Sequence, residues 1–543
     1  MTPIPFIRTI FVLAVMLLLT VLPGVCHAFH VAAISIPAYG HFMPMKGIAE
    51  KLLLRGHRVT LFVETESWCA SELANNATYD CVIMPNSGTF SKETLMELSQ
   101  GSLTDSFTEI FKEILQHNRE QLGNYLDAFQ RVHGTHPFDM ILMDLSTMVG
   151  FSLSKKFDVP HVSVFPLTMH MAIGSTTYLP SLGTEYPRKM SFTQRLYNFW
   201  LKVFVSGLSQ ILISEMNRAH ELHNIPPMRS AAELAGFDGL IFAPTIWGHD
   251  IPQPLCPNIV PLGAFSPSVE HHPIEPELLT FLDTCANGAV YVNFGTLAVV
   301  GDSMFARVKE ALYRLPFCVV WKVAEDDRRA QLPQDARFFV SKRFENPIAI
   351  MQHPSTHVFL THCGDTSLME AVQAELPLAG IPFFADQGDV CQRMDEAGIG
   401  RYVGHKHTFT ADELESILVD VATSKRYKER IRDIHSISKL YGGVNRAADI
   451  IEERMANDLL RPDAFTESCG YLTEWSGLPK SNALVQEYDF LLIYFALIGL
   501  VCYGCVRCVR RCIGSHTLDT DNAQVYQGKS PSVKVVRRAK ITD

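Results

Sequence analysis

The chain has 543 residues, of which 47% are hydrophobic and 19% charged, and its formal net charge is −10. This length allows two domains with full hydrophobic cores plus further segments. The composition is typical of a globular protein and excludes a largely disordered one. The acidic balance offers no electrostatic surface for nucleic acid, so we expect no nucleic-acid partner.

The N-terminus has the pattern of a secretory signal peptide. Arg8 precedes an apolar run from Ile10 to Leu22, and Cys26-His27-Ala28 follows at the cleavage position. We predict that residues 1–28 form the signal peptide and are removed after Ala28. An uncleaved membrane anchor is the alternative. The glycosylation sequon Asn76-Ala77-Thr78 agrees with a secretory protein.

The first half of the mature chain has the rhythm of a parallel α/β sheet. A buried strand from Phe29 ends in the glycine turn Tyr39-Gly40-His41, a helical pattern runs from Met45 to Leu54, and Arg58 to Val63 reads as a second strand. This is one βαβ unit. Further strands are expected at Asp139–Met143 and His161–Phe165. We predict a Rossmann-like domain over residues 29–251.

The stretch from Pro180 to Met216 mixes aromatic and basic side chains, such as Tyr197, Trp200 and Lys202. It predicts a helix with two possible locations. The helix packs in the first domain, or it lies on a membrane surface.

The same rhythm restarts after a proline-rich stretch. Residues 252–276 hold seven prolines in 25 residues, which is typical of a linker. The strands expected beyond it are Ala289–Thr296 with a glycine turn, Cys318–Val323, His357–Leu360 and Leu378–Ile381. We predict a second Rossmann-like domain over residues 277–460. The fold class is α/β, with two doubly wound domains whose ligands bind at the carboxyl ends of the strands.

The segment from Thr361 to Gln387 carries the clearest chemistry. An apolar strand turns through Gly364 into a helix, and a helix start of this kind offers free N–H groups to a phosphate. Polar side chains surround this turn, and an Asp-Gln pair that suits sugar hydroxyls ends the segment. These residues are His362, Thr366, Ser367, Glu370, Asp386 and Gln387. The segment predicts a nucleotide-diphosphate site.

The C-terminal region predicts a membrane anchor. Residues 490–506 form a run without a charge, which is at the short limit for a transmembrane helix. Arg507, Arg510 and Arg511 follow it, so the positive-inside rule places the tail 507–543 in the cytoplasm and the body in the lumen, with 461–489 as a juxtamembrane segment. The lumenal cysteines allow one or two disulfides, whose pairing the sequence leaves open. Palmitoylation of the cysteines near the span is possible.

With His41, Thr296, His362, Glu370 and Asp386-Gln387 in view, the chain resembles the membrane-anchored, animal-type UDP-glycosyltransferases over nearly its whole length. The resemblance implies two Rossmann-like domains facing across a cleft, the GT-B architecture. It also implies an inverting mechanism that uses no metal and no cofactor besides the UDP-sugar co-substrate. An endoplasmic reticulum location and a possible homo-oligomer complete these expectations.

The resemblance also assigns roles by position. His41 is expected to be the catalytic base and Asp144 its carboxylate partner. The donor phosphates are expected at His362, Gly364, Thr366 and Ser367, the ribose at Glu370, the nucleotide at Gly295 and Thr296, and the sugar at Asp386 and Gln387.

The chain departs from the family pattern where uracil is read. The family's tryptophan and glutamine are replaced in the run Phe344-Glu345-Asn346-Pro347, which leaves stacking to Phe344. Cys363 replaces a glycine and is interpreted as a small packing residue. Thr366 and Val390 each replace an asparagine. These changes affect uracil selectivity and donor affinity, while the phosphate, ribose and sugar contacts are retained.

The expected activity is transfer of a hexose from a UDP-sugar to a hydroxyl of a small lipophilic acceptor. Glucose is slightly favoured over glucuronic acid, because no arginine is evidently placed to meet a sugar carboxylate. One alternative is a non-catalytic binding or assembly subunit that keeps the fold. Another is a nicotinamide-dependent oxidoreductase, which is disfavoured because neither glycine turn reads G-x-G-x-x-G.

Overall fold

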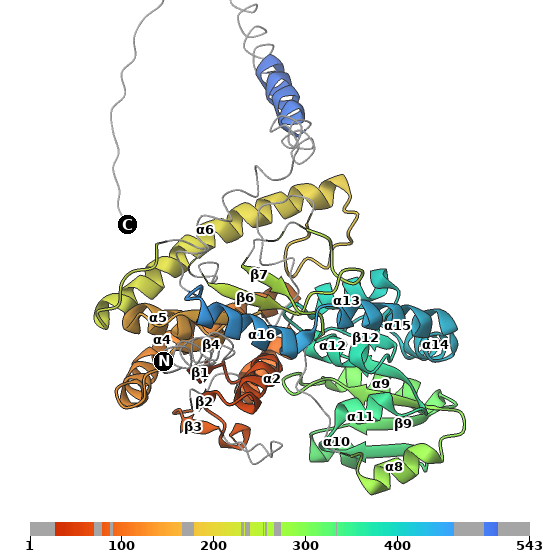
Figure 1. Ribbon diagram of the computed structural model, residues 1–543. Helices are drawn as coiled ribbons and strands as arrows, with labels where there is room; N and C mark the ends of the chain where they lie inside the picture. The colour runs from red at the N-terminus through yellow and green to blue at the C-terminus, as the bar shows by residue number, and fades with distance from the viewer. Residues whose placement is uncertain are drawn as a thin grey trace, which may run out of the picture. The chain divides into compact units, whose positions relative to one another are not determined.

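The computed structural model describes residues 28–69, 79–86, 91–101, 103–165, 179–229, 233, 239–253, 255, 258–264, 273–332, 334–460 and 494–508 (Figure 1). The chain forms two units, Met1–Lys480 and Ser481–Asp543. The predicted signal peptide up to His27, the glycosylation sequon and the tail beyond Cys508 lie outside the described residues.

The first sheet has seven strands in the order β3-β2-β1-β4-β5-β6-β7, and every pairing is parallel. The central strands β1, β4, β5 and β6 are buried along their whole length, as parallel strands covered on both faces must be. The bounds of the strands are β1 His30–Ile34, β2 Arg58–Val63, β3 Asp80–Ile83, β4 Met140–Asp144, β5 His161–Val164, β6 Leu240–Ala243 and β7 Ile259–Pro261. β7 lies inside the predicted proline-rich linker, so the sheet continues into that stretch.

Helices and one 3₁₀ turn surround this sheet. Their bounds are α2 Tyr39–Leu54, η1 Glu66–Trp68, α3 Lys92–Gln100, α4 Leu103–His133, α5 Met148–Phe157 and α6 Phe192–Leu222. α2 begins six residues before the predicted start at Met45, so His41 lies in the first helical turn rather than on a loop.

The second sheet has six parallel strands in the order β10-β9-β8-β11-β12-β13. Its strands are β8 Ala289–Asn293, β9 Cys318–Lys322, β10 Phe338–Ser341, β11 Thr356–Thr361, β12 Leu378–Gly380 and β13 Gly400–Tyr402. The helices of this part are α8 Pro276–Asp283, α9 Asp302–Arg314, α10 Asp326–Ala330, α11 Pro347–Gln352, α12 Asp365–Gln373, α13 Gln387–Ala397, α14 Ala411–Thr423, α15 Lys425–Lys439 and α16 Gly443–Ala456. The predicted α/β class with two parallel sheets is confirmed.

Two apolar clusters lie on each sheet, one on either face. On β8, for example, Val290 and Val292 join one cluster while Ala289 and Tyr291 join the other, because successive side chains of a strand point to opposite faces. The first sheet is divided in the same way. Because each sheet is packed on both faces, the ends of its strands are held in place, and the site residues lie at those ends.

The last helix of the folded body returns to the first sheet. α16 packs on α2, and its residues Ala447, Ala448 and Ile451 belong to the core of the first sheet (Figure 1). At the rim, Arg55 on the first sheet's side bonds Glu452 at 2.7 Å. α16 therefore ties the two sheets together.

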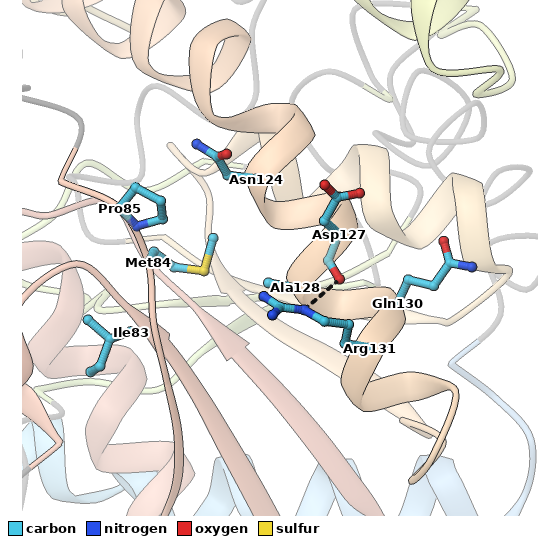
Figure 2. Close-up of a pocket in the computed structure, with 8 residues that line it drawn as sticks. All are labelled: Ile83, Met84, Pro85, Asn124, Asp127, Ala128, Gln130 and Arg131. Atoms are coloured by element: carbon cyan, nitrogen blue, oxygen red, sulfur yellow. Dashed lines mark hydrogen bonds between the residues drawn. The ribbon is translucent and has the colours of Figure 1, made fainter.

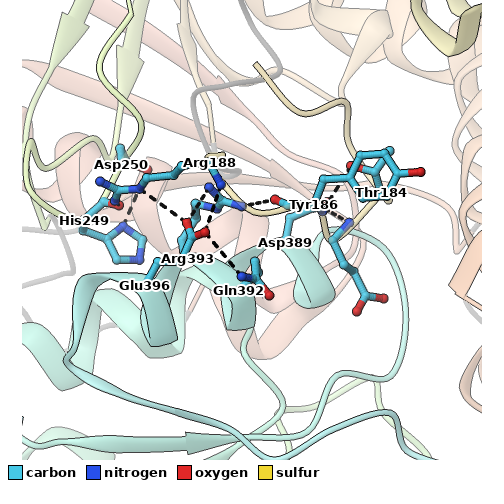
Figure 3. A network of polar contacts seen from close by, with 10 residues as sticks. Thr184, Tyr186, Arg188, His249, Asp250, Asp389, Gln392, Arg393 and Glu396 are labelled. Atoms are coloured by element: carbon cyan, nitrogen blue, oxygen red, sulfur yellow. Dashed lines mark hydrogen bonds and ion pairs between the residues drawn. The ribbon is translucent and has the colours of Figure 1, made fainter. Parts of the chain in front are cut away.

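A polar network joins the segment after β5 to α13 of the second sheet (Figure 3). The buried Asp389 carboxylate accepts the backbone N–H groups of Gly183 at 2.6 Å and Glu185 at 2.9 Å. Arg393 donates to the carbonyl of Tyr186. Gly388 is needed here, because a Cβ at that position would lie 2.6 Å from the Glu185 side chain. The network holds the first sheet's segment against the start of α13.

Three disulfides occur among the described residues, where the sequence predicted one or two: Cys69–Cys81, Cys285–Cys318 and Cys363–Cys391. The interpretation of Cys363 as a packing residue is wrong. Its sulfur is bonded to Cys391 on α13, and its backbone is left-handed with φ 63°, a conformation that favours the glycine it replaces. The disulfide ties the turn after β11 to α13.

Replacing the pair by Cys363→Gly and Cys391→Ala should lower the free energy of unfolding by about 2 to 3 kcal/mol. Loss of the 28-residue loop closure outweighs the relief of the left-handed backbone. Chemical denaturation checks the stability, and calorimetry should also show weaker UDP binding. The control pair Cys285→Ala and Cys318→Ala should destabilise the protein without changing UDP affinity. An equal loss of UDP affinity in both variants would contradict a local role.

Apolar helices suited to a membrane were sought in the described ranges. One helix, α6, is long and apolar enough to cross a bilayer by length and composition alone. The predicted C-terminal span, residues 490–506, overlaps a shorter apolar helix, Tyr494–Cys508.

Candidate functional site

A histidine and an aspartate meet at the carboxyl ends of β1 and β4. His41 lies in the first turn of α2, and Asp144 is the last residue of β4, the strand next to β1. His41 Nδ1 lies 2.7 Å from Asp144 Oδ1. The carboxylate also accepts from Thr147 Oγ1 at 2.7 Å and from the N–H of Ser146 at 3.2 Å. With its proton on Nδ1, His41 keeps Nε2 as a free acceptor.

The electrostatics of this pair favour a protonatable imidazole. Burial lowers the pKa of His41, but the Asp144 carboxylate and its hydrogen bond, with Asp386 in addition, outweigh burial and raise the pKa above its usual value. Asp144 is fully buried and keeps three donors. The pair can accept a proton from a neighbouring hydroxyl and stabilise the resulting imidazolium.

The predicted phosphate turn lies at the carboxyl end of β11. α12 begins at Asp365 after Gly364 as N-cap, and no side chain caps its first turn. Thr366 and Ser367 lie in that first turn. The free N–H groups at the start of the helix are therefore open to an anion, as the sequence predicts.

The ring of His362 lies between two glycine turns. A Cβ on Gly295, where φ is +78°, would come within 2.7 Å of this ring, and one on Gly364 within 2.5 Å. Both glycines are thus required by the close approach of the imidazole. Burial, with a smaller effect of Lys322, lowers the pKa of His362 to about 3. His362 is a neutral hydrogen-bond donor here and brings no positive charge.

Lys322 is a basic residue beside these turns that was not predicted from the sequence. It ends β9 beside β8, and its Nζ donates to the carbonyl of Gly295 at 2.9 Å. Its charge acts on both His362 and Glu370. A basic residue directly after the apolar run Cys318–Trp321, at the sheet edge that holds the glycine turns, was the signal that could have found it. Lys322 is suited to a diphosphate.

Two carboxyl groups, Asp365 and Asp386, are buried near this turn, and Glu370 is half-buried beside it. Burial raises the pKa of Glu370 to about 7, against the opposing effect of Lys322, and raises that of Asp386 to about 6. The oxygens Asp365 Oδ1 and Asp386 Oδ2 are buried without a hydrogen-bond partner. Unpartnered buried oxygens of this kind favour hydroxyl-bearing ligands, because leaving them unmatched is costly.

The predicted sugar pair stands at the start of α13. Asp386 is its N-cap and Gln387 its first residue. Gln387 Oε1 accepts the N–H groups of Phe383 at 2.9 Å and Phe384 at 3.2 Å. The amide oxygen is therefore engaged within the turn, so only the Nε2 group of Gln387 could donate to a ligand.

The part of the site on the first sheet and the part on the second sheet are in direct contact. Pro44 in α2 has no N–H, so the carbonyl of Gly40, four residues earlier, lacks its helical partner. Thr366 Oγ1 of the second half donates to that carbonyl at 3.0 Å. The charge of Asp386 acts on His41, and that of Glu370 acts on Tyr39. The structure thus brings His41 and the phosphate turn together in one site.

The run Phe344–Pro347, where the sequence predicts the uracil contact, takes part in the packing of the fold. Phe344 is 5% exposed and packs against Tyr291 and Phe339, so its stacking on a base stays a prediction. Asn346 and Pro347 have a structural role at the start of α11. Asn346 is the N-cap and its Oδ1 accepts the N–H of Ala349, while Pro347 is the first residue of the helix. Thr296 is exposed beside Gly295.

A hollow of about 510 Å³ lies elsewhere on the first sheet's side, between the end of β3 and α4 (Figure 2). Its lining includes Met84, Asn124 and Arg131 but none of the candidate site residues. Within the described ranges, no group of three His, Cys, Asp or Glu side chains could hold a metal ion.

Comparison with known proteins agrees with this geometry. Residues 33–441 match the family model described as UDP-glucoronosyl and UDP-glucosyl transferase. The chain is 25% identical to UDP-glucuronosyltransferase 1A9 of Mus musculus, covering 74% of this chain and 78% of the relative. It is also 25% identical to UDP-glycosyltransferase UGT4 of Dactylopius coccus (67% of this chain, 73% of the relative) and to 2-hydroxyacylsphingosine 1-beta-galactosyltransferase of Homo sapiens (75% and 76%).

Solved structures share the fold. The glycosyltransferase of kitacinnamycin has a TM-score of 0.59 at 17% identity, covering 79% of this chain and all of that one. CalG4, the calicheamicin glycosyltransferase, has a TM-score of 0.54 at 17% identity, covering 79% of this chain and 99% of that one. The expected GT-B architecture of the folded body is confirmed.

Proposed function

Since the chain belongs to the UDP-glycosyltransferase family and is a glycosyltransferase, we propose that it transfers a hexose from a UDP-sugar to a hydroxyl of a small lipophilic acceptor, with inversion at the anomeric carbon. The observation that carries the proposal is the contact between the two half-sites. The His41–Asp144 pair and the phosphate turn meet at the hydrogen bond from Thr366 to Gly40.

The reaction follows from these groups. His41 Nε2 takes the proton of the acceptor hydroxyl while its oxygen forms a bond to the anomeric carbon, and Asp144 stabilises the imidazolium. The bond from that carbon to the β-phosphate oxygen breaks, and the electron pair leaves with UDP. Lys322 and the free N–H groups of α12 stabilise the charge that develops on the diphosphate. A single displacement from the opposite side inverts the configuration.

The sugar end favours a neutral hexose such as glucose. Asp386 has a pKa of about 6 because of burial and is largely ionised at neutral pH. A carboxylate accepts hydrogen bonds from sugar hydroxyls, but it repels the carboxylate of glucuronic acid. The names of the relatives include glucuronosyl and galactosyl transferases, so the donor is a matter for experiment.

The location proposed is the lumenal side of an intracellular membrane, with a single C-terminal anchor. The three disulfides among the described residues support an oxidising compartment, since cytosolic thiols are kept reduced. The apolar helix Tyr494–Cys508 supports the anchor.

The test is a donor screen with the purified full-length protein. UDP-glucose, UDP-galactose and UDP-glucuronic acid are each incubated with a panel of lipophilic alcohols and phenols, and UDP release and product mass are measured. Transfer from UDP-glucose that His41→Ala abolishes is the expected result. If calorimetry detects no UDP binding and no donor reacts, the non-catalytic alternative is favoured instead.

Donor binding should tighten as pH rises from about 6 to 8. The pKa of Glu370 is about 7, so its carboxyl becomes ionised in this range and accepts ribose hydroxyls more strongly. UDP-glucose is the suitable probe, because its diphosphate has no group that titrates near neutral pH. Calorimetry across this range should show about a threefold to tenfold gain. Glu370→Gln should flatten the profile, and an unchanged slope in this variant would exclude Glu370 as its cause.

A further inference from the structure

Buried side chains near both ends of helix α6 form hydrogen bonds with the first domain. Near its start, Asn198 accepts the N–H of Ser181 at 2.7 Å and donates to the carbonyl of Leu179 at 2.8 Å. Near its end, His220 contacts Ser152 Oγ at 2.8 Å and the carbonyl of Pro226 at 2.9 Å. Both polar residues are fully buried. α6 is therefore a helix of the folded body.

The opposite face of α6 is apolar and exposed. Tyr197 is 55% exposed, Trp200 46%, Phe204 67% and Ile211 59%, and Val203 adjoins them at 49%. Steps of three and four residues, with Gly207 between Phe204 and Ile211, place these side chains on one side of the helix. The stripe extends over about 21 Å at 1.5 Å per residue. In Figure 1, α6 is the long yellow helix along one side of the folded body.

Because Asn198 and His220 are buried, α6 can contact a bilayer only in a restricted way. By length and composition alone the helix could span a membrane. Spanning would strip Asn198 and His220 of their hydrogen bonds and leave them in hydrocarbon, at a cost of several kcal/mol each. Only the outward face is available to lipid, so the helix would lie parallel to the surface.

The charges around the stripe match a lipid surface. From Tyr186 to Ser214 the sequence has no Asp or Glu, although the whole chain has a net charge of −10. Its basic residues are Lys189, Arg195 and Lys202, besides Arg188, which is paired with Glu396 of α13. Tyrosine and tryptophan, which the stripe contains, are the residues enriched at membrane interfaces. Local positive charge favours anionic headgroups.

We propose that Tyr197, Trp200, Val203, Phe204 and Ile211 of α6 insert into the headgroup layer of a bilayer that contains anionic lipid. The contact is separate from any C-terminal anchor. It would hold the catalytic body against the membrane, where lipophilic acceptors are concentrated.

The first test uses the full-length protein in vesicles of phosphatidylcholine and phosphatidylserine, prepared with and without brominated acyl chains. Bromine quenches tryptophan that reaches the lipid. Trp200→Phe should remove part of the quenchable emission. Trp321→Phe is the control and should remove none of it, because Trp321 is 1% exposed in the second sheet. Equal quenchable emission in wild type and Trp200→Phe would overturn the proposal.

The second test removes the C-terminal segment. All four apolar clusters of the described residues lie within the unit Met1–Lys480, so a chain of residues 29–480 is expected to fold. This chain should float with phosphatidylserine-containing vesicles. Tyr197→Gln with Phe204→Gln should reduce the bound fraction at least about fivefold. Leu279→Gln with Leu440→Gln, at exposed leucines elsewhere, should have no effect.

Two outcomes of the second test would overturn the proposal. One is equal flotation of wild type and the Tyr197→Gln, Phe204→Gln variant. The other is a wild-type chain that does not bind vesicles but forms a dimer, and a variant that is monomeric. The stripe would then bind a second copy of the chain. Equal binding to neutral and anionic vesicles would overturn the assigned preference for anionic lipid.

Discussion

Replacing His41 by alanine should lower kcat by about two to four powers of ten while UDP affinity stays unchanged. The variant loses the Nε2 acceptor that takes the proton of the attacking hydroxyl. The donor groups His362, Lys322 and Glu370 stay in place on the other half of the site. Steady-state kinetics and calorimetry with UDP on the same preparation separate the two effects.

The control for this variant is His136→Ala, which removes an exposed histidine whose ring contacts Thr135 between α4 and β4, outside the candidate site. It should leave both kcat and UDP affinity unchanged. If His41→Ala retained wild-type kcat, the proton would have to leave by another route and the proposed mechanism would be wrong.

The pH profile gives an independent check of the same pair. A general base acts only when unprotonated, so activity is lost as pH falls through the pKa of His41. The Asp144 carboxylate outweighs burial and raises that pKa, so the acid limb of kcat/KM should lie above pH 6.5. Asp144→Asn should move the limb to lower pH and also reduce kcat, because the tautomer is no longer fixed. If the acid limb did not move in Asp144→Asn, a group other than His41 would be responsible for it.

Replacing Lys322 by methionine should weaken UDP binding by about tenfold to a hundredfold. His362 is neutral at working pH, because burial lowers its pKa to about 3, so it brings no charge to the diphosphate. Lys322 Nζ, which donates to the carbonyl of Gly295 at 2.9 Å, is the group that we propose provides that charge. Methionine keeps most of the side-chain volume and removes the ammonium group.

Uridine and UDP together make this measurement specific. Uridine lacks the diphosphate, so Lys322→Met should leave its affinity nearly unchanged, whereas UDP affinity falls. Lys342→Met, at an exposed lysine on the next loop, is the matched control and should change neither. Wild-type UDP affinity in Lys322→Met would show that the helix N–H groups suffice for the diphosphate.

Local pattern was enough to predict the strand, turn and helix of the phosphate site. β11 ends at Thr361 and α12 begins at Asp365, where an apolar run, a glycine and a helical pattern meet in the sequence. The start of α2 was misplaced because Pro44 resembles a helix boundary. In the structure the proline lies within the helix, and its missing N–H leaves the Gly40 carbonyl to Thr366.

The sequence by itself determined the α/β class, the two parallel sheets and the main polar residues at their strand ends. Hydrophobic periodicity and glycine turns are local properties, and short-range sterics and burial decide them. The tertiary structure alone decided that Lys322 lies against the Gly295 turn, that Cys363 is bonded to Cys391, and that Phe344 is buried. It also decided which face of α6 is left exposed. Each of these depends on neighbours distant in the chain, and the partner that reaches a side chain is fixed only when the sheets and helices pack.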